Sequence, residues 1–82
     1  MKRILTKVLD TTPTVYNSTL GLEGPMQLRA RSSNSVTVLI SLAGQGQEFE
    51  LGAGQFIEVN MKLSDLLARG PSGTPTLDVL VH

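Results

Sequence analysis

Three glutamates in the second half of the chain have the spacing that most readily suggests chemistry. Glu48, Glu50 and Glu58 flank a glycine-rich segment at 52–54, and apolar residues alternate with them at period two. This pattern predicts a hairpin with a three-residue loop, because that loop length keeps the apolar residues of both strands on one face. In this hairpin Glu48 lies directly across from Glu58, on the outward face beside Glu50.

Such a group of carboxylates has three interpretations. The favoured one is a solvated acidic face that discourages edge-to-edge aggregation of the sheet. The second is an acidic patch that meets a basic patch on a neighbouring chain. The third is a calcium site, which the absence of an Asp-rich loop disfavours.

Basic residues are concentrated in the other half of the chain. Residues 1–41 carry five Lys or Arg against two Asp or Glu, which is +3, and residues 42–82 carry two against five, which is −3. The net charge of zero therefore conceals two halves of opposite sign, which can be satisfied within one subunit or between subunits. Arg29 and Arg31 stand two apart on the outward face of one predicted strand, where they suit acidic partners or phosphates.

The groups that catalysis usually requires are scarce. The chain has no cysteine, and its one histidine is the last residue, His82. No glycine-flanked serine elbow is present, and the Gly-x-Gly segments at 44–46 and 52–54 lack the following helix and the lysine of a phosphate-binding loop. We therefore expect a protein that is not an enzyme and that has no cofactor and no catalytic or metal-binding residues.

The composition favours β structure to hold these side chains. Thr, Ser, Gly, Pro and Asn make up 30 of the 82 residues, and alanine occurs four times. Strands are predicted at 14–20, 26–31, 36–42, 47–51, 55–60 and 76–81, with residues 2–9 as a further candidate. We predict one all-β domain over residues 1–82: a small antiparallel β-sandwich or barrel of six to seven short strands. One helical turn is expected near residues 62–69, and residues 1–10 form either an N-terminal arm or an edge strand.

Some apolar residues fall on the nominally outer faces of their strands, namely Leu39, Phe56 and Leu80. A chain of this length has a thin core, so covering these residues by a neighbour would stabilise it. We expect a homo-oligomer, with a trimer favoured. The candidate interface residues are Lys2, Arg3, Lys7, Arg29, Arg31, Glu48, Glu50, Phe56 and Glu58.

The order of segments from residue 35 to residue 82 resembles that of small bacteriophage virion proteins. An apolar strand at 36–42 leads to a glycine-rich turn, and a short strand ends in Leu-x-x-Gly at 51–54. A further strand then enters the Leu-Ser-Asp-Leu turn at 63–66, and Thr-Leu-x-Val-Leu closes the domain at 76–80. Similar chains include capsid decoration and cement proteins, which are compact β domains seated on a capsid lattice.

The resemblance implies a non-catalytic structural protein of the virion. Its partner would be the major capsid protein or another virion protein, and it would lie on the capsid surface after assembly in the host cytoplasm. An alternative is a glycan- or receptor-binding β module of a phage fibre or adhesin, although the chain has no Trp and one Tyr for sugar stacking. A small nucleic-acid-binding barrel comes third, because the charge balance disfavours phosphate binding. No apolar run approaches the roughly 20 residues of a membrane helix, so no membrane partner is expected.

Overall fold

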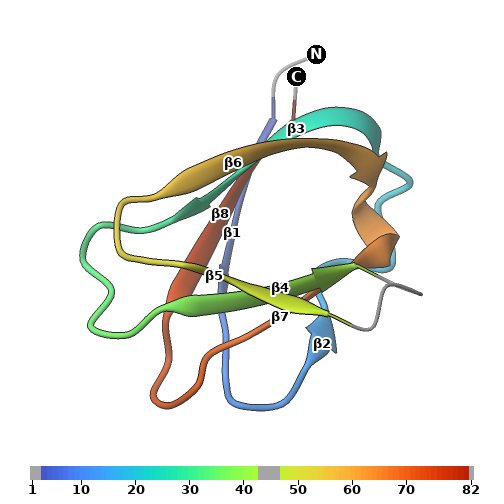
Figure 1. The fold of residues 1–82 in the computed structure, drawn as a ribbon. Coiled ribbons are helices and arrows are strands. Elements are labelled where there is room, and N and C mark those ends of the chain that lie inside the picture. The colour runs from blue at the N-terminus through green and yellow to red at the C-terminus, as the bar shows by residue number, and fades with distance from the viewer. Residues whose placement is uncertain (1–2, 43–46, 82) are drawn as a thin grey trace.

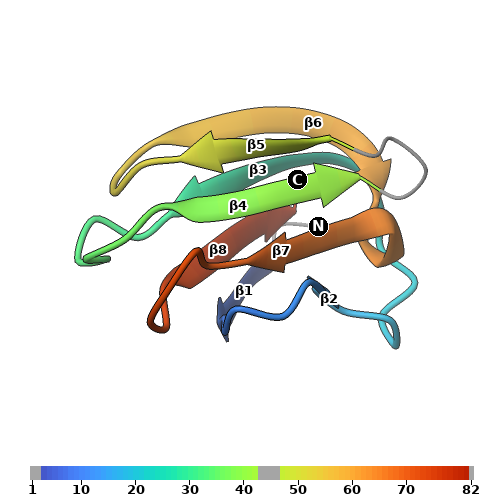
Figure 2. The same cartoon turned by 60° about the horizontal axis from the view of Figure 1, so that its bottom comes forward.

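Two antiparallel sheets of four strands each make up the protein. The computed structural model describes residues 3–42 and 47–81. One sheet contains, in spatial order, β1 (Arg3–Val8), β8 (Thr76–Val81), β3 (Glu23–Ala30) and β6 (Phe56–Lys62). The other contains β2 (Thr14–Val15), β7 (Leu66–Arg69), β4 (Val38–Leu42) and β5 (Glu48–Leu51). We name them the 1-8-3-6 sheet and the 2-7-4-5 sheet after the order of their strands. Figures 1 and 2 show the two sheets facing each other.

The strands pair as in one long antiparallel hairpin that is folded back on itself. The first strand pairs with the last, the second with the seventh, the third with the sixth and the fourth with the fifth. Two further pairings, β3 with β8 and β4 with β7, join these ribbons into the two sheets. This is the topology of a jelly roll. The predicted all-β antiparallel fold is therefore confirmed.

The predicted hairpin at residues 47–60 is wrong. β5 pairs with β4 and β6 pairs with β3, so the segment 52–55 crosses from one sheet to the other. Gly54 makes this turn at a φ of +80°, and its N–H donates to the Ala30 carbonyl at 2.9 Å. Period-two alternation is equally compatible with a hairpin and with a crossing between layers, because each strand has one inward face either way. Because of this crossing, β5 pairs with the interior strand β4 and β6 pairs with the interior strand β3.

Two other segments differ from the sequence prediction. The helical turn is present but is limited to a 3-10 turn, η1 (Leu63–Asp65), and residues 66–69 continue as β7. Residues 66–69 form a strand and not a helix because they pair with β2 on one side and with β4 on the other. The strand predicted at 14–20 is reduced to the two residues of β2.

The core lies between the sheets and is built from alternate strand residues. Met26, Leu28 and Ala30 of β3 are buried, as their alternation predicts, and so are Val38 and Ile40 of β4. Each fully buried Leu, Ile, Val or Met side chain stabilises the fold by roughly 1.5–3 kcal/mol. The alternate residues of these strands point away from the core. The described residues contain no helix that is long and apolar enough to cross a membrane.

Residues 3–8 at the N-terminus form an edge strand rather than a free arm. β1 is antiparallel to β8 over all six of its residues. The half-buried Lys7 side chain reaches the other sheet, where its Nζ donates to the carbonyls of Val15 at 3.3 Å and Tyr16 at 3.2 Å. Lys7 therefore joins the two sheets on this side of the molecule.

Candidate functional site

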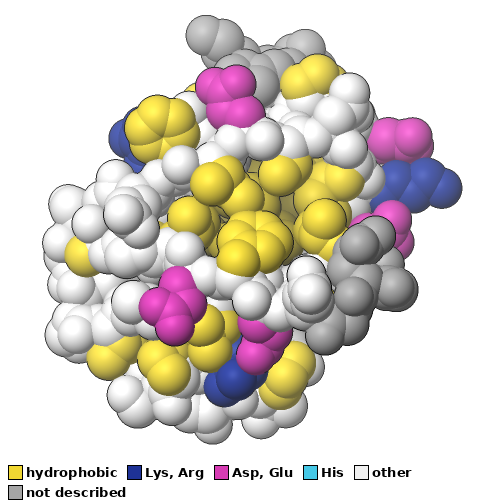
Figure 3. Space-filling view, in the orientation of Figure 1, with side chains coloured by type: hydrophobic (Ala, Val, Ile, Leu, Met, Phe, Trp, Pro, Cys, Tyr) yellow, Lys and Arg dark blue, Asp and Glu magenta, His cyan; other side chains and the backbone are white. Residues whose placement is uncertain are grey.

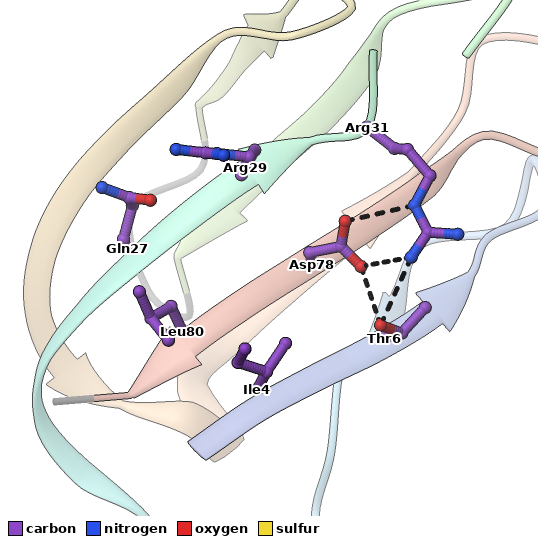
Figure 4. Close-up of a pocket in the computed structure, with 7 residues that line it drawn as sticks. All are labelled: Ile4, Thr6, Gln27, Arg29, Arg31, Asp78 and Leu80. Carbon is purple, nitrogen blue, oxygen red and sulfur yellow. Dashed lines mark hydrogen bonds and ion pairs between the residues drawn. The ribbon is translucent and has the colours of Figure 1, made fainter. Parts of the chain in front are cut away.

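The outer face of the 1-8-3-6 sheet brings together side chains from all four of its strands. The register aligns them in rows across the sheet: one row is Ile4, Leu80, Gln27 and Glu58, and the next is Thr6, Asp78, Arg29 and Phe56. Seven residues of this outer face line an open hollow of about 260 Å³: Ile4, Thr6, Gln27, Arg29, Arg31, Asp78 and Leu80. Figure 4 shows these side chains standing on one side of β1, β8 and β3.

A polar network ties three of these strands together. Arg31 donates to both oxygens of Asp78, from Nη2 to Oδ1 at 2.9 Å and from Nε to Oδ2 at 3.3 Å. The Thr6 hydroxyl donates to Asp78 Oδ1 at 2.8 Å (Figure 4). A two-point contact between a guanidinium and a carboxylate fixes both groups in one plane. The pair lies at the surface, so its contribution to stability is about 0–1 kcal/mol, and its main effect is to hold Arg31 in position.

Arg29 and Phe56 form a cation–π contact on the same face. The guanidinium carbon of Arg29 lies 5.4 Å from the centre of the Phe56 ring. Such an arrangement at an exposed site is worth roughly 0.5–1 kcal/mol. Phe56 is still 51% exposed, so the ring keeps a large apolar surface available to a partner.

Apolar surface continues along the edge of the sheet formed by β1. Ile4 is 73% exposed and Val8 is 62% exposed, and both lie on the same face as the half-buried Leu80. Apolar side chains, an aromatic ring and two arginines are the composition typical of the buried centre of a protein interface. The geometry is therefore suited to binding a protein surface.

Two of the three predicted glutamates lie away from this face. Glu48 and Glu50 belong to β5 in the 2-7-4-5 sheet, whereas Glu58 belongs to β6 in the other sheet. The predicted pairing of Glu48 with Glu58 is therefore wrong, since Glu48 lies opposite Ser41 and Glu58 opposite Gln27. The three carboxylates do not form one acidic face.

Glu48 has its own partner within the subunit. Arg69 donates to it from Nε at 2.8 Å and from Nη2 at 2.9 Å. This hydrogen bonding lowers the pKa of the Glu48 carboxyl below its usual range. Within residues 3–42 and 47–81, no three acidic or histidine side chains gather as a metal site would require.

Of the other predicted interface residues, Arg29, Arg31 and Phe56 lie on the outer face, as the strand pattern indicated. Arg3 is exposed at the start of β1, and Lys7 is engaged in joining the two sheets. Lys2 lies outside the described residues.

Sequence reasoning missed Asp78, Thr6 and Gln27. A signal for Asp78 was present, because it is the one charged residue in an otherwise apolar final strand and so must face outward. Its pairing with Arg31 depends on β3 lying beside β8, which the local pattern does not specify.

Tyr16 is buried in the core, and its hydroxyl has a structural role. Its hydroxyl donates to the carbonyl of Leu77 at 2.8 Å. Burial, and secondarily the negative charge of Asp78, raise the pKa of the phenol well above its usual range. The hydroxyl therefore stays protonated and connects the segment after β2 to β8.

No protein family, curated protein or solved structure that matches this chain was found.

Proposed function

We propose that this chain is a non-catalytic structural protein of a virion that decorates or cements a phage capsid. The observation that carries the proposal is the outer face of the 1-8-3-6 sheet, where exposed Ile4, Val8 and Phe56 surround side chains already fixed by the Arg31–Asp78 pair. On this proposal the outer face docks on the major capsid protein or another virion protein, and the chain lies on the capsid surface.

Two physical arguments support docking through this face. First, Asp78 holds Arg31 in position before binding, so less side-chain entropy is lost there when a partner arrives. Second, apolar surface of this kind on a small domain usually marks an interaction site. The jelly-roll topology is consistent with a capsid role because viral capsid domains use it, although lectins do as well, so the topology alone does not assign the function.

Docking of this kind acts through repetition. One small face gives a modest affinity, but contacts repeated over a lattice, or made by copies that are themselves linked, raise the overall avidity by orders of magnitude. A shell covered in this way loses many contacts at once if its subunits separate. The expected effect of the chain on a capsid is therefore resistance to heat and to mechanical disruption.

The test is binding to purified shells that lack the chain. Added protein should sediment with the shells and saturate at a fixed number of copies per shell subunit, and the loaded shells should withstand a higher temperature. Binding that does not saturate, or an absence of binding to shells from the phage that encodes the chain, would contradict the proposal.

One observation favours the glycan- or receptor-binding alternative. The hollow of about 260 Å³ has Thr6, Gln27 and Asp78 beside an apolar floor of Ile4 and Leu80, which are groups that can receive a hydroxyl-rich ligand. A glycan array separates the two functions. Specific retention of one sugar class, together with no shell binding, would replace the capsid proposal with this alternative.

A further inference from the structure

Arg31 lies one residue beyond the end of β3, where the pairing of strands no longer holds it. The last register pair of β3 with β8 is Ala30 with Leu77. Both backbone groups of Arg31 are nevertheless hydrogen-bonded: its N–H donates to the Thr76 carbonyl at 3.2 Å, and its carbonyl accepts from the Asn34 N–H at 3.0 Å. The place of this arginine on the outer face of the 1-8-3-6 sheet therefore depends on the turn that follows it.

The half-buried side chain of Asn34 joins this turn to the start of β8. Its Oδ1 accepts from the Thr76 N–H at 2.8 Å, and its Nδ2 donates to the Thr76 carbonyl at 2.9 Å. An amide side chain has one acceptor oxygen and an N–H donor, as a backbone peptide group does, so it can take the place of a neighbouring strand. The Thr76 carbonyl has two lone pairs and accepts from both Arg31 and Asn34. Asn34 therefore continues the contact between β3 and β8 past the last register pair.

Neither charge nor apolar packing is available to hold this turn. Residues 32–35 are Ser, Ser, Asn and Ser, and the three serines are exposed. At the left of Figure 3, where Figure 1 places the segment between β3 and β4, the surface is largely white, which marks uncharged polar side chains and backbone. Hydrogen bonds are then the main forces on the turn, and Asn34 takes part in all but one of those just described.

The contact between Arg31 and Asp78 requires the turn to be held. Asp78 lies two residues after Thr76, on the same outward face of β8. Arg31 reaches it with two hydrogen bonds, from Nη2 at 2.9 Å and from Nε at 3.3 Å, and a two-point contact of this kind has a strict geometry. A displacement of about 0.5 Å or more is enough to disturb such a geometry. The Arg31 side chain is 45% exposed, so the position of its backbone matters more than packing around it.

We propose that Asn34 is a positioning residue for the outer face: it fixes the backbone of Arg31 against β8, so that a partner meets the guanidinium in its place beside Asp78. Asn34 acts through Arg31 and makes no contact with the partner itself. The inference rests on the proposed docking function for the use of Arg31 in binding. The effect of Asn34 on Arg31 is a property of the free protein, so the two can be tested separately.

The first test measures how fast the Arg31 Nε–H exchanges with water, by NMR on the free protein. Asn34→Ala removes both hydrogen bonds to Thr76 and should raise this rate about threefold or more, because the Nε–H then spends more time away from Asp78. Asn34→Asp keeps the size of the side chain and the acceptor for the Thr76 N–H, but it sets an oxygen against the Thr76 carbonyl. It should raise the rate as well, which separates a lost hydrogen bond from lost volume. Wild-type exchange in both variants would overturn the proposal.

Asn17→Ala is the matched control for a general loss of stability. Asn17 is also half-buried and also holds a turn, since its Oδ1 accepts from the N–H groups of Thr19 at 2.9 Å and Leu20 at 3.0 Å. This turn follows β2, a strand of the other sheet. Asn17→Ala should lower the unfolding midpoint as Asn34→Ala does, yet leave the exchange of the Arg31 Nε–H as in wild type. Equally raised exchange in the two alanine variants would contradict a specific effect on Arg31.

Binding to purified shells then tests the link to docking. Asn34→Ala should weaken binding by about threefold to tenfold in the wild-type background, and by less than about twofold in an Arg31→Ala background, since Asn34 acts through Arg31. Equal weakening in the two backgrounds would contradict positioning through Arg31. If the wild-type protein does not bind shells while the exchange of the Arg31 Nε–H responds to Asn34, the docking function fails and the role of Asn34 in holding Arg31 stands.

Discussion

Arg31 and Asp78 lie 47 residues apart in the sequence yet share two hydrogen bonds on the outer face. The outward direction of Arg29 and Arg31 follows from the alternation of a single strand, and it could be predicted. The identity of their partners could not, because it depends on which strand lies next to β3. At this scale the sequence determines where a side chain points, and the topology determines what it meets.

The Tyr16 hydroxyl provides a direct test of the buried contacts. Tyr16→Phe should lower the free energy of unfolding by about 1–2 kcal/mol, because it leaves the Leu77 carbonyl without its donor. Its folded-state pKa is raised above the ordinary value of 10.0, so the stabilisation is complete below about pH 10 and is lost as the pH rises further. Urea unfolding at neutral and alkaline pH measures both effects. Equal stability of the two proteins at neutral pH would contradict this role.

The Glu48–Arg69 pair predicts the opposite pH dependence. Hydrogen bonds from Arg69 lower the folded-state pKa of Glu48 below the ordinary value of 4.5, so any stabilisation by this pair is present above that pH. It is lost as the pH falls through the lower folded-state value. The difference in unfolding midpoint between wild type and Glu48→Gln should therefore be small but measurable near pH 7, and it should shrink as the pH falls below 4.5. A difference that grows in acid would contradict the assignment.

Individual strands could be predicted from their alternation, but their partners could not. The strands at 26–31, 36–42 and 76–81 are present with the expected inward residues, because one buried face imposes a period of two. The segment 47–60 forms two strands, as predicted, but they enter different sheets. Residues 66–69 suit a helix or a strand by local pattern, and pairing with β2 and β4 decides between them.

The turn after β7 depends on a glycine for reasons of space. A Cβ at Gly70 would lie 2.6 Å from Cδ of Pro75, and the Gly70 N–H donates to the Asp10 carbonyl at 2.8 Å. Gly70→Ala should therefore destabilise the protein by about 1–3 kcal/mol, as overpacking does. Gly21→Ala is the matched control, because nothing lies within 4 Å of the added methyl group, and its effect should be within about 0.5 kcal/mol. Thermal unfolding measures both, and equal effects would contradict the account.

For the whole molecule, the jelly roll separates two kinds of surface. The inner faces of the two sheets form the core, while the outer face of the 1-8-3-6 sheet is exposed and carries the residues proposed for docking. The opposite charges of the two halves of the sequence are partly neutralised within the subunit by Arg31 with Asp78, whereas Arg69 and Glu48 pair within the second half.

Sedimentation of face variants with purified shells tests the central claim most directly. Arg29→Glu reverses a charge at the centre of the docking face on an interior strand, and Ser41→Lys introduces a charge on an interior strand of the other sheet, on the outer side of the 2-7-4-5 sheet. We predict that Arg29→Glu weakens shell binding about tenfold or more, as the loss of a central interface arginine does, while Ser41→Lys binds as wild type. Unchanged binding of Arg29→Glu, or a loss confined to Ser41→Lys, would contradict docking through this face.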